Sequence, residues 1–323
     1  MTVEQKKSGL RTAPVSDQPL VSFVLIAYNQ EKFICEAING ALSQTHEPME
    51  LVLSDDCSSD RTFEIMKEMA AAYTGPHRIV LNRNAKNLGI GMHFQQAVAL
   101  SSGQWIVAAA GDDISVPERV AKCMEIVMTH GELGCISGRF HGFSSQFKDV
   151  KKRAPVQDVV KVIRGADASW LGYSKRGKIP GMPGCAAMWN RKLFELFSSI
   201  PPGVVAEDVV LRCRALISGL GVGFTSAGLV HYRAHDANCS SGVQKELFVR
   251  RVYFSKAVVH RDLLEYRKNH PNLYSDEIWE RMIRYFETYL FRSIVIVRRN
   301  EVGRFWSQIL YLIGFRGARR SKA

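Results

Sequence analysis

The sequence contains no uninterrupted apolar run of the roughly 18 residues that a membrane-spanning helix needs. Residues 1–17 are polar and lack the apolar centre of a secretion signal, so we expect residues 1–18 to form a disordered tail. The seven cysteines are scattered and never form a Cys-x-x-Cys pair. We therefore expect unpaired thiols in a reducing cytoplasm and no structural zinc site.

Nucleic-acid-binding signatures are also absent, although the net charge of +12 would suit such a partner. The basic excess lies in residues 146–178 and 284–323, and neither segment matches a helix-turn-helix, a zinc finger or an RNP motif. Basic clusters near apolar helices also serve anionic membranes or phosphorylated ligands, and a solvated basic surface is the plainest interpretation. We expect no nucleic-acid partner.

What the chain does have is the composition of a globular protein, with 46% hydrophobic and 23% charged residues. Short apolar segments alternate four times with segments of helical spacing. The expected strands are residues 20–28, 49–56, 78–82 and 104–113, and the expected helices are residues 30–44, 61–73, 91–100 and 117–130. Such alternation predicts an α/β fold, in which a mostly parallel sheet carries helices on both faces.

Beyond residue 134 the alternation weakens. Residues 144–182 are basic and rich in glycine and proline, and we expect a loop or a mobile flap there. The remaining expectations are a strand and a helix within 182–198, a helix at 208–218, an extended segment at 222–233, helices at 245–269 and from 275, and an amphipathic helix at 302–315. The last third of the chain is thus expected to be helical.

Two of the expected strands end in paired carboxylates, Asp55-Asp56 and Asp112-Asp113. The carboxyl ends of parallel strands meet at one edge of the sheet, which is where open α/β sheets bind ligands. Acid pairs at that edge suit a nucleotide base, a ribose and a divalent cation on phosphates. A third pair, Glu207-Asp208, begins an expected helix, where acids are common for dipole reasons alone.

Several motifs in order give the chain a resemblance to a known family. They are VSFVLIAYN (21–29), ALSQT (41–45), DDCSSDRT (55–62), NLG (87–89), GDD (111–113) with Pro117 following, Glu207-Asp208 and HYRAHD (231–236). Over residues 20–240 this order resembles family 2 glycosyltransferases of the bacterial surface-polysaccharide type, which have the Rossmann-like GT-A fold. The resemblance implies a GT-A domain at 19–243 and a basic, amphipathic, helical extension at 244–323.

The resemblance also implies an activity, the metal-dependent, inverting transfer of a sugar from a nucleotide donor to a hydroxyl of a glycan. It makes Asp208 the general base and gives Glu207 an acceptor-orienting or structural role. Asp113 would hold Mg²⁺ or Mn²⁺, and Asp112 would contact the ribose or a metal-bound water. Ala110 stands where fuller versions of the motif have another acid, so diphosphate oxygens would complete the coordination shell of the cation.

The nucleotide sugar would be bound, by the same resemblance, through Ala27, Tyr28, Asp56, Arg83, Asn87, Asp112 and Arg233. A carboxylate such as Asp56 offers only acceptors, so it selects a base edge that presents an N–H. His235 would ligate the cation or the diphosphate through neutral imidazole, and Arg233 would pair with phosphate oxygens. Each of these residues also has a plainer interpretation, as a turn, capping or surface residue.

The resemblance further implies a lipid-linked acceptor in O-antigen or capsule synthesis, in the cytoplasm or peripherally on the cytoplasmic face of the inner membrane. Residues 302–323 either pack on the catalytic domain or place Phe305 and Trp306 in the headgroup boundary of a membrane. Two other functions stay open. One is a nucleotidyltransferase or sugar-nucleotide-binding protein of the same fold, and the other is a basic nucleic-acid-binding protein.

Overall fold

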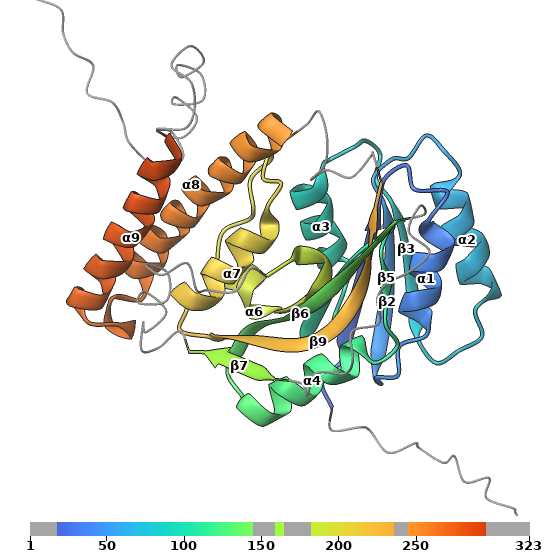
Figure 1. The fold of residues 1–323 in the computed structure, drawn as a ribbon, viewed down its shortest axis with the longest axis horizontal. Coiled ribbons are helices and arrows are strands. Elements are labelled where there is room, and N and C mark those ends of the chain that lie inside the picture. The colour runs from blue at the N-terminus through green and yellow to red at the C-terminus, as the bar shows by residue number, and fades with distance from the viewer. Residues whose placement is uncertain (1–17, 145–158, 165–181, 236–244, 295–323) are drawn as a thin grey trace, which may run out of the picture.

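The computed structural model describes residues 18–144, 159–164, 182–235 and 245–294 (Figure 1). In this part of the chain, nine strands form one sheet in the order β3-β2-β1-β4-β8-β6-β9-β5, with β7 paired to β9. The strands are β1 (Val21–Ala27), β2 (Met49–Asp55), β3 (Arg78–Arg83), β4 (Trp105–Ala110), β5 (Ile114–Ser115), β6 (Leu133–Ser144), β7 (Val160–Ile163), β8 (Ala187–Asn190) and β9 (Gly221–Ala234).

The helices flank this sheet in two groups (Figure 1). They are α1 (Ile34–Leu42), α2 (Thr62–Ala72), α3 (Ile90–Ala99), α4 (Arg119–His130), α6 (Lys192–Glu195), α7 (Glu207–Ile217), α8 (Lys245–Asn269) and α9 (Asp276–Ile294), with short 3-10 helices η1 (Gly184–Ala186) and η3 (Pro271–Leu273). One apolar cluster joins the sheet to α1, α2 and α4, and a second joins it to α3, α6, α7, α8 and α9. Helices therefore cover both faces, as the sequence predicts.

The first four strands of the sheet, β3, β2, β1 and β4, are parallel. Nearly every residue of β1, β2 and β4 is buried, which is why these strands are continuously apolar instead of alternating. The register pairs Ala27 with Asp55 and Ile26 with Ala110, so the three strands end level with one another. The chain segments that follow β2 and β4 therefore leave the sheet at the same edge, on either side of the end of β1.

The other half of the sheet departs from the sequence-based expectations in two places. Residues 160–163 form β7 within a segment that we expected to be a loop, and β6 is a long strand that the apolar pattern did not reveal. Glycines interrupt the pattern of β6, yet packing requires two of them. A Cβ on Gly134 would lie 2.5 Å from the Cβ of Ala215, and one on Gly138 would lie 2.4 Å from Leu229 Cδ1. Close approach of other elements therefore selects residues that local propensity disfavours.

The helix α8 is fastened to α7 by a buried ion pair. Arg214 Nε lies 2.7 Å from Asp262 Oδ2, and both side chains are at most 1% exposed. Arg214 Nη2 also donates to the carbonyl of Ser198 at 2.6 Å. The described helices beyond residue 244 thus share the core of the sheet domain, and the predicted domain boundary at 243/244 stays a prediction.

No helix in the described residues is long and apolar enough to cross a membrane. The expected amphipathic helix at 302–315, with the basic residues after it, lies outside the described residues. The two interpretations of residues 302–323, packing or membrane contact, therefore remain predictions.

Candidate active site

The turn that carries Asp112 and Asp113 is fixed to the end of β1 by Gly111. The Gly111 N–H donates to the carbonyl of Ile26 at 3.0 Å. A Cβ at this position would lie 2.5 Å from Gln30 Oε1 and 2.8 Å from the Cβ of Ala27. Only glycine allows this approach. The first residue of the GDD motif therefore permits close packing of the turn on β1, and Asp112 and Asp113 supply the functional side chains.

The C-terminal end of β9 holds this acidic turn from the other side. The backbone N–H of Arg233 donates to Asp113 Oδ1 at 2.9 Å, and Arg233 Nε donates to the carbonyl of Asp112 at 3.0 Å. Asp113 is only 6% exposed. Burial, followed by the charge of Asp112, raises the pKa of Asp113 to about 7, against the opposing effects of the Arg233 N–H and of the Arg119 and Arg233 charges.

An aromatic residue at the start of α1 packs against His235 and Arg233. His235 Nε2 lies 3.1 Å from Asp112 Oδ2, and the His235 ring is 4.8 Å from the ring of Phe33. The guanidinium of Arg233 lies 4.9 Å from the same ring and 2.9 Å from Glu36 Oε2. Phe33 and Glu36 were not among the predicted site residues, because the sequence marks them only as members of the expected helix at 30–44.

The second acid pair begins α7. Burial, followed by the charge of Asp208, raises the pKa of Glu207 to about 8. Burial also raises the pKa of Asp208, although the N–H groups of Val209 and Gly184 and the charge of Arg212 oppose the shift. Gly184 lies directly against the pair, since a Cβ there would be 3.2 Å from Glu207 Oε1 and 3.4 Å from the Cβ of Asp208. A carboxylate with such a raised pKa is suited to accept a proton near neutral pH.

The short helix η1 brings the two acid pairs together. The thiol of Cys185, in η1, has its pKa raised to about 12, first by burial and then by the charges of Asp113, Asp208 and Asp112. The half-buried Cys185 side chain therefore lies near acids from both pairs. The structure thus gathers Asp112, Asp113, Glu207, Asp208, Arg233 and His235, and it does so through a glycine and a cysteine that the sequence analysis did not single out.

Asp56 organises a neighbouring loop at the same edge of the sheet. Its backbone N–H donates to the carbonyl of Ala27 at 2.9 Å. Its carboxylate accepts hydrogen bonds from Asn84 Nδ2 at 2.8 Å and from the N–H groups of Leu88 and Gly89, each at 2.9 Å. Asp56 does not cap α2, the next helix in the chain. Its carboxylate instead accepts hydrogen bonds from the loop before α3. Strand spacing puts the ends of β2 and β4 roughly 10 Å apart.

The remaining predicted nucleotide contacts flank Asp56. Tyr28, which follows β1, is 48% exposed, and Asn87 Oδ1 accepts the N–H of Gly89 at 3.1 Å. The side chain of Arg83 contacts the segment 55–64. Its Nη2 donates to the carbonyl of Ser58 at 2.8 Å, and its Nε lies 3.5 Å from Asp55 Oδ2. The structure does not bring Arg83 to the acids after β4, and its nucleotide role stays a prediction.

The donor atoms at this turn fit a small divalent cation. Asp112 and Asp113 supply carboxylate oxygens and His235 supplies an imidazole nitrogen, which suits Mg²⁺ or Mn²⁺. Burial and the charge of Asp112 raise the pKa of Asp113, and a cation bound beside it would stabilise its charged form. Among the described residues no group of three or more His, Cys, Asp and Glu side chains could hold a metal ion by itself. A bound cation would therefore also use oxygens of a substrate or water.

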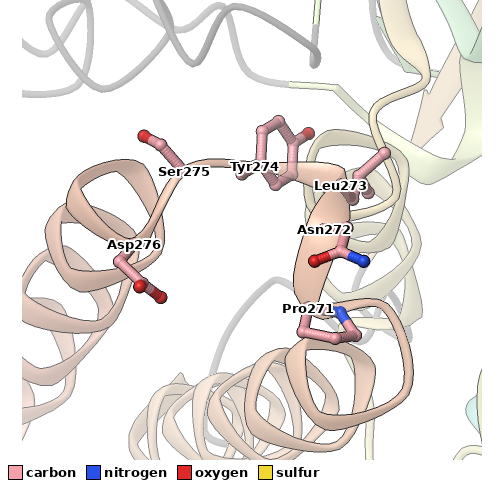
Figure 2. A pocket seen from close by; sticks show the side chains of 6 residues that line it. All are labelled: Pro271, Asn272, Leu273, Tyr274, Ser275 and Asp276. Carbon is pink, nitrogen blue, oxygen red and sulfur yellow. The ribbon is translucent and has the colours of Figure 1, made fainter.

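A hollow near the C-terminal end of α7 is not part of this site. It lies at the turn between α8 and α9 and is lined by residues 271–276 (Figure 2). Tyr274 in this turn donates to the carbonyl of Leu216, at the C-terminal end of α7, at 3.0 Å. Since Glu207 and Asp208 begin that 11-residue helix, roughly 15 Å separates the hollow from them along its axis.

Solved structures share this fold. Residues 1–349 of TarS from S. aureus align with 91% of this chain and 79% of that chain, with a TM-score of 0.59 and 16% sequence identity. A mannosyltransferase from Pyrobaculum calidifontis, PcManGT, solved in complex with GDP-Man and Mn²⁺, aligns with 94% of this chain and 77% of its own, with a TM-score of 0.54 and 16% identity. The mostly parallel sheet with helices on both faces thus has the GT-A fold of these structures.

The sequence comparison names the family. The model described as glycosyl transferase family 2 matches residues 22–197, more than half of the chain. Chondroitin synthase of Escherichia coli is 33% identical over 132 residues, which are 41% of this chain and 19% of that protein. The chain spans less than half the length of the curated relatives it matches first. The protein belongs to glycosyl transferase family 2.

Proposed function

We propose that this protein is a metal-dependent, inverting glycosyltransferase that moves a sugar from a nucleotide sugar to a hydroxyl of a glycan. The observation that carries this proposal is the position of η1: Gly184 lies against Glu207 and Asp208, and Ala187, directly after η1, shares the guanidinium of Arg119 with Ala108, in the strand that leads to Asp112 and Asp113. A cation-binding acid and a proton-accepting acid thus belong to one site. The proposal also fits the family, whose members transfer glycosyl groups.

Asp208 is the general base of the proposed reaction. Its pKa is raised by burial, so at neutral pH it holds a proton more readily than an ordinary aspartate does. It removes the proton of the acceptor hydroxyl as the oxygen attacks the anomeric carbon opposite the diphosphate. One displacement inverts the anomeric configuration. Glu207 orients the acceptor or supports Asp208, whose charge in turn raises the pKa of Glu207.

The donor binds along the edge formed by the ends of β2, β1 and β4. Asp113, Asp112 and His235 would hold Mg²⁺ or Mn²⁺, which stabilises the negative charge on the departing nucleoside diphosphate. Arg233 lies beside these residues and can pair with phosphate oxygens. Ala27, Tyr28 and Asp56 lie where β1 and β2 end and form the proposed nucleoside pocket. The neighbours TarS and PcManGT support a sugar nucleotide as ligand, since they were solved with UDP-GlcNAc and with GDP-Man.

We propose a surface polysaccharide, carried on a lipid, as the acceptor, and a cytoplasmic or peripheral location on the inner face of the membrane. The match to a chondroitin synthase supports a polysaccharide. The basic excess of the chain supports contact with an anionic surface or a phosphorylated carrier.

A panel of sugar nucleotides with Mn²⁺ or Mg²⁺ tests the proposal. The true donor should raise the melting temperature of the protein and release nucleoside diphosphate when glycan acceptors are added. NMR of the product should show an inverted anomeric centre. Asp208→Asn should lower turnover by about 100- to 10,000-fold while donor binding is kept. Unchanged turnover in this variant would overturn the base assignment. Donor binding without transfer to any acceptor would favour a sugar-nucleotide-binding protein, and formation of a sugar nucleotide would favour a nucleotidyltransferase.

A further inference from the structure

Arg119, the first residue of α4, carries a guanidinium group that is buried among backbone carbonyls. The side chain is 1% exposed. Its Nη2 donates to the carbonyl of Ala108 at 2.7 Å and to the carbonyl of Ala187 at 3.1 Å, and its Nη1 donates to Ser115 Oγ at 2.9 Å. None of the site residues described above is among these three partners.

The two carbonyls belong to the two halves of the active site. Ala108 lies in β4, immediately upstream of the turn with Asp112 and Asp113, and Ala187 directly follows η1. The antiparallel register of β4 and β8 ends at Val107 and Met188, so Ala108 and Ala187 are the next opposed residues. One nitrogen of Arg119 bonds to both carbonyls where the β4–β8 pairing stops. It therefore ties the strand of the cation-binding turn to the segment that contacts the base.

The link from Ala187 to the base is short. Gly184, in η1, lies directly against the acid pair, since a Cβ there would be 3.2 Å from Glu207 Oε1 and 3.4 Å from the Cβ of Asp208. Any shift of η1 relative to β4 therefore changes the spacing between Asp208 and Asp113. Such a spacing matters, because a misplacement of about 1 Å in an active site can lower the rate roughly 100-fold.

The charge of Arg119 points to the same role. Within the described residues no carboxylate lies within ion-pair distance of its guanidinium, and burying a lone cation costs several kcal/mol. A buried methionine or leucine would avoid this cost. The nearby acid Asp113 gives a physical reason for a cation here, since the positive charge of Arg119 offsets part of its negative charge at longer range.

We propose that Arg119 is a positioning residue for glycosyl transfer, which holds the cation-binding turn and the general base at a fixed spacing without contacting substrate. This inference rests on the proposed function. It differs from a purely structural role in what it predicts. We call the hydrogen bonds from Arg119 to Ala108 and Ala187 the bridge. Loosening this bridge should lower kcat more than it lowers the affinity for the donor, because the donor lies on the ends of β2, β1 and β4.

The variant Arg119→Lys tests this proposal, because lysine keeps the positive charge but lacks the planar fork that reaches several acceptors. A matched control is Arg191→Lys. Arg191 donates to the carbonyl of Gly103 at 2.5 Å and to Ser101 Oγ at 2.7 Å, near the opposite end of the β4–β8 pairing. Both arginines thus bind backbone and hydroxyl oxygens of loops and strands, but only Arg119 adjoins the acids.

We expect Arg119→Lys to lower kcat by about 10- to 100-fold with a donor KM within about twofold of the parent value. Arg191→Lys should keep kcat per folded molecule, even where its melting temperature falls. Equal kcat in the two variants, or a loss in Arg119→Lys that merely follows the folded fraction, overturns the proposal.

A second measurement does not depend on transfer. The Cys185 thiol should be alkylated about tenfold faster in folded Arg119→Lys than in the parent protein, since Ala187, the residue that follows η1, loses a charge-assisted hydrogen bond. Mass spectrometry would follow the label, with exposed Cys35 as the internal reference. An unchanged rate at Cys185 shows that the bridge does not hold η1 and overturns the proposal. If the parent protein transfers no sugar but Cys185 is alkylated faster in Arg119→Lys, the proposed transfer function is wrong, whereas the structural link through Arg119 is supported.

Discussion

The carboxylate of Asp113 accepts a hydrogen bond from the backbone N–H of Arg233 at 2.9 Å, and the two residues are 120 positions apart in the chain. The donor is a main-chain group, so β9 holds this acid whichever side chain stands at 233. The same contact leaves the second oxygen of Asp113 for a cation. The mixed and irregular half of the sheet thereby orients an acid that follows the last strand of the parallel half.

The first prediction concerns the pH dependence of cation binding. The pKa of Asp113 is raised to about 7 by burial, and a cation must displace this proton. We expect the apparent affinity for Mn²⁺ to be constant above pH 7 and to fall by about tenfold per pH unit below it. Electron paramagnetic resonance of free Mn²⁺ would measure the affinity from pH 5.5 to 8.5.

Two variants accompany that titration. Asp113→Asn keeps an acceptor for the Arg233 N–H and should fold, but it should lose the Mn²⁺ affinity together with the pH dependence. Glu125→Gln, which removes an exposed acid of α4, should change neither. Mn²⁺ affinity that is independent of pH down to 5.5 in the parent protein would contradict the assignment of Asp113.

The second prediction concerns the pH dependence of stability through Glu207. Its pKa is about 8 in the folded protein and about 4.5 when the chain is unfolded. Between these values the folded state binds more protons than the unfolded state, so the free energy of unfolding should fall as pH rises. Urea denaturation at pH 5, 6.5 and 8 would measure this slope. In Glu207→Gln the slope should be smaller, and parallel curves for variant and parent would show that Glu207 does not cause it.

The third prediction concerns the space beside Gly184. A methyl group there would meet Glu207 Oε1 at 3.2 Å and the Cβ of Asp208 at 3.4 Å, so the acids must move by a few tenths of an ångström. We expect Gly184→Ala to fold and to lower kcat by about tenfold, because the base is displaced. Gly142→Ala is the matched control, since nothing lies within 4 Å of a Cβ at that position of β6. Equal initial rates in the two variants would show that an added methyl group at position 184 does not displace the base.

The fourth prediction concerns the contact between α7 and α8. Asp262→Ala would leave Arg214 buried without its partner, and we expect the free energy of unfolding to fall by about 3–5 kcal/mol. Asp276→Ala, which removes a 94% exposed partner of Arg267, should cost less than about 1 kcal/mol. Chemical denaturation of both variants would measure the difference. A small effect at Asp262 would indicate that α8 is dispensable for the stability of the sheet domain.

Much of the fold could be predicted because its signals are local. Each of the strands β1, β2, β3 and β4 is a short apolar run, and each following helix shows apolar residues at helical spacing, so these elements appear within a few residues of their predicted bounds. The strand β6 could not be predicted in this way. Gly134 and Gly138 break its apolar pattern, and the reason for them is the proximity of Ala215 and Leu229 on other elements.

The active site divides in the same manner. Acids at strand ends and at a helix start are visible in the sequence, and the order of the motifs pointed to a family that residues 22–197 match. Phe33, Gly184, Cys185 and Arg119 were not visible as site residues, because an aromatic, a glycine, a cysteine and an arginine have no local pattern that marks them. Their importance comes from what they contact across the fold.

The sequence by itself determined which residue types lie at the ends of the parallel strands, since apolar runs and the polar residues that follow them are written in consecutive positions. Only the tertiary structure decided that η1 joins the acids of β4 to those of α7, and that Arg119 bonds to Ala108 and Ala187 at once. The physical reason is that hydrogen bonds and burial act over a few ångströms in space. Packing of the whole chain, and not spacing along it, sets which distant residues come within that range.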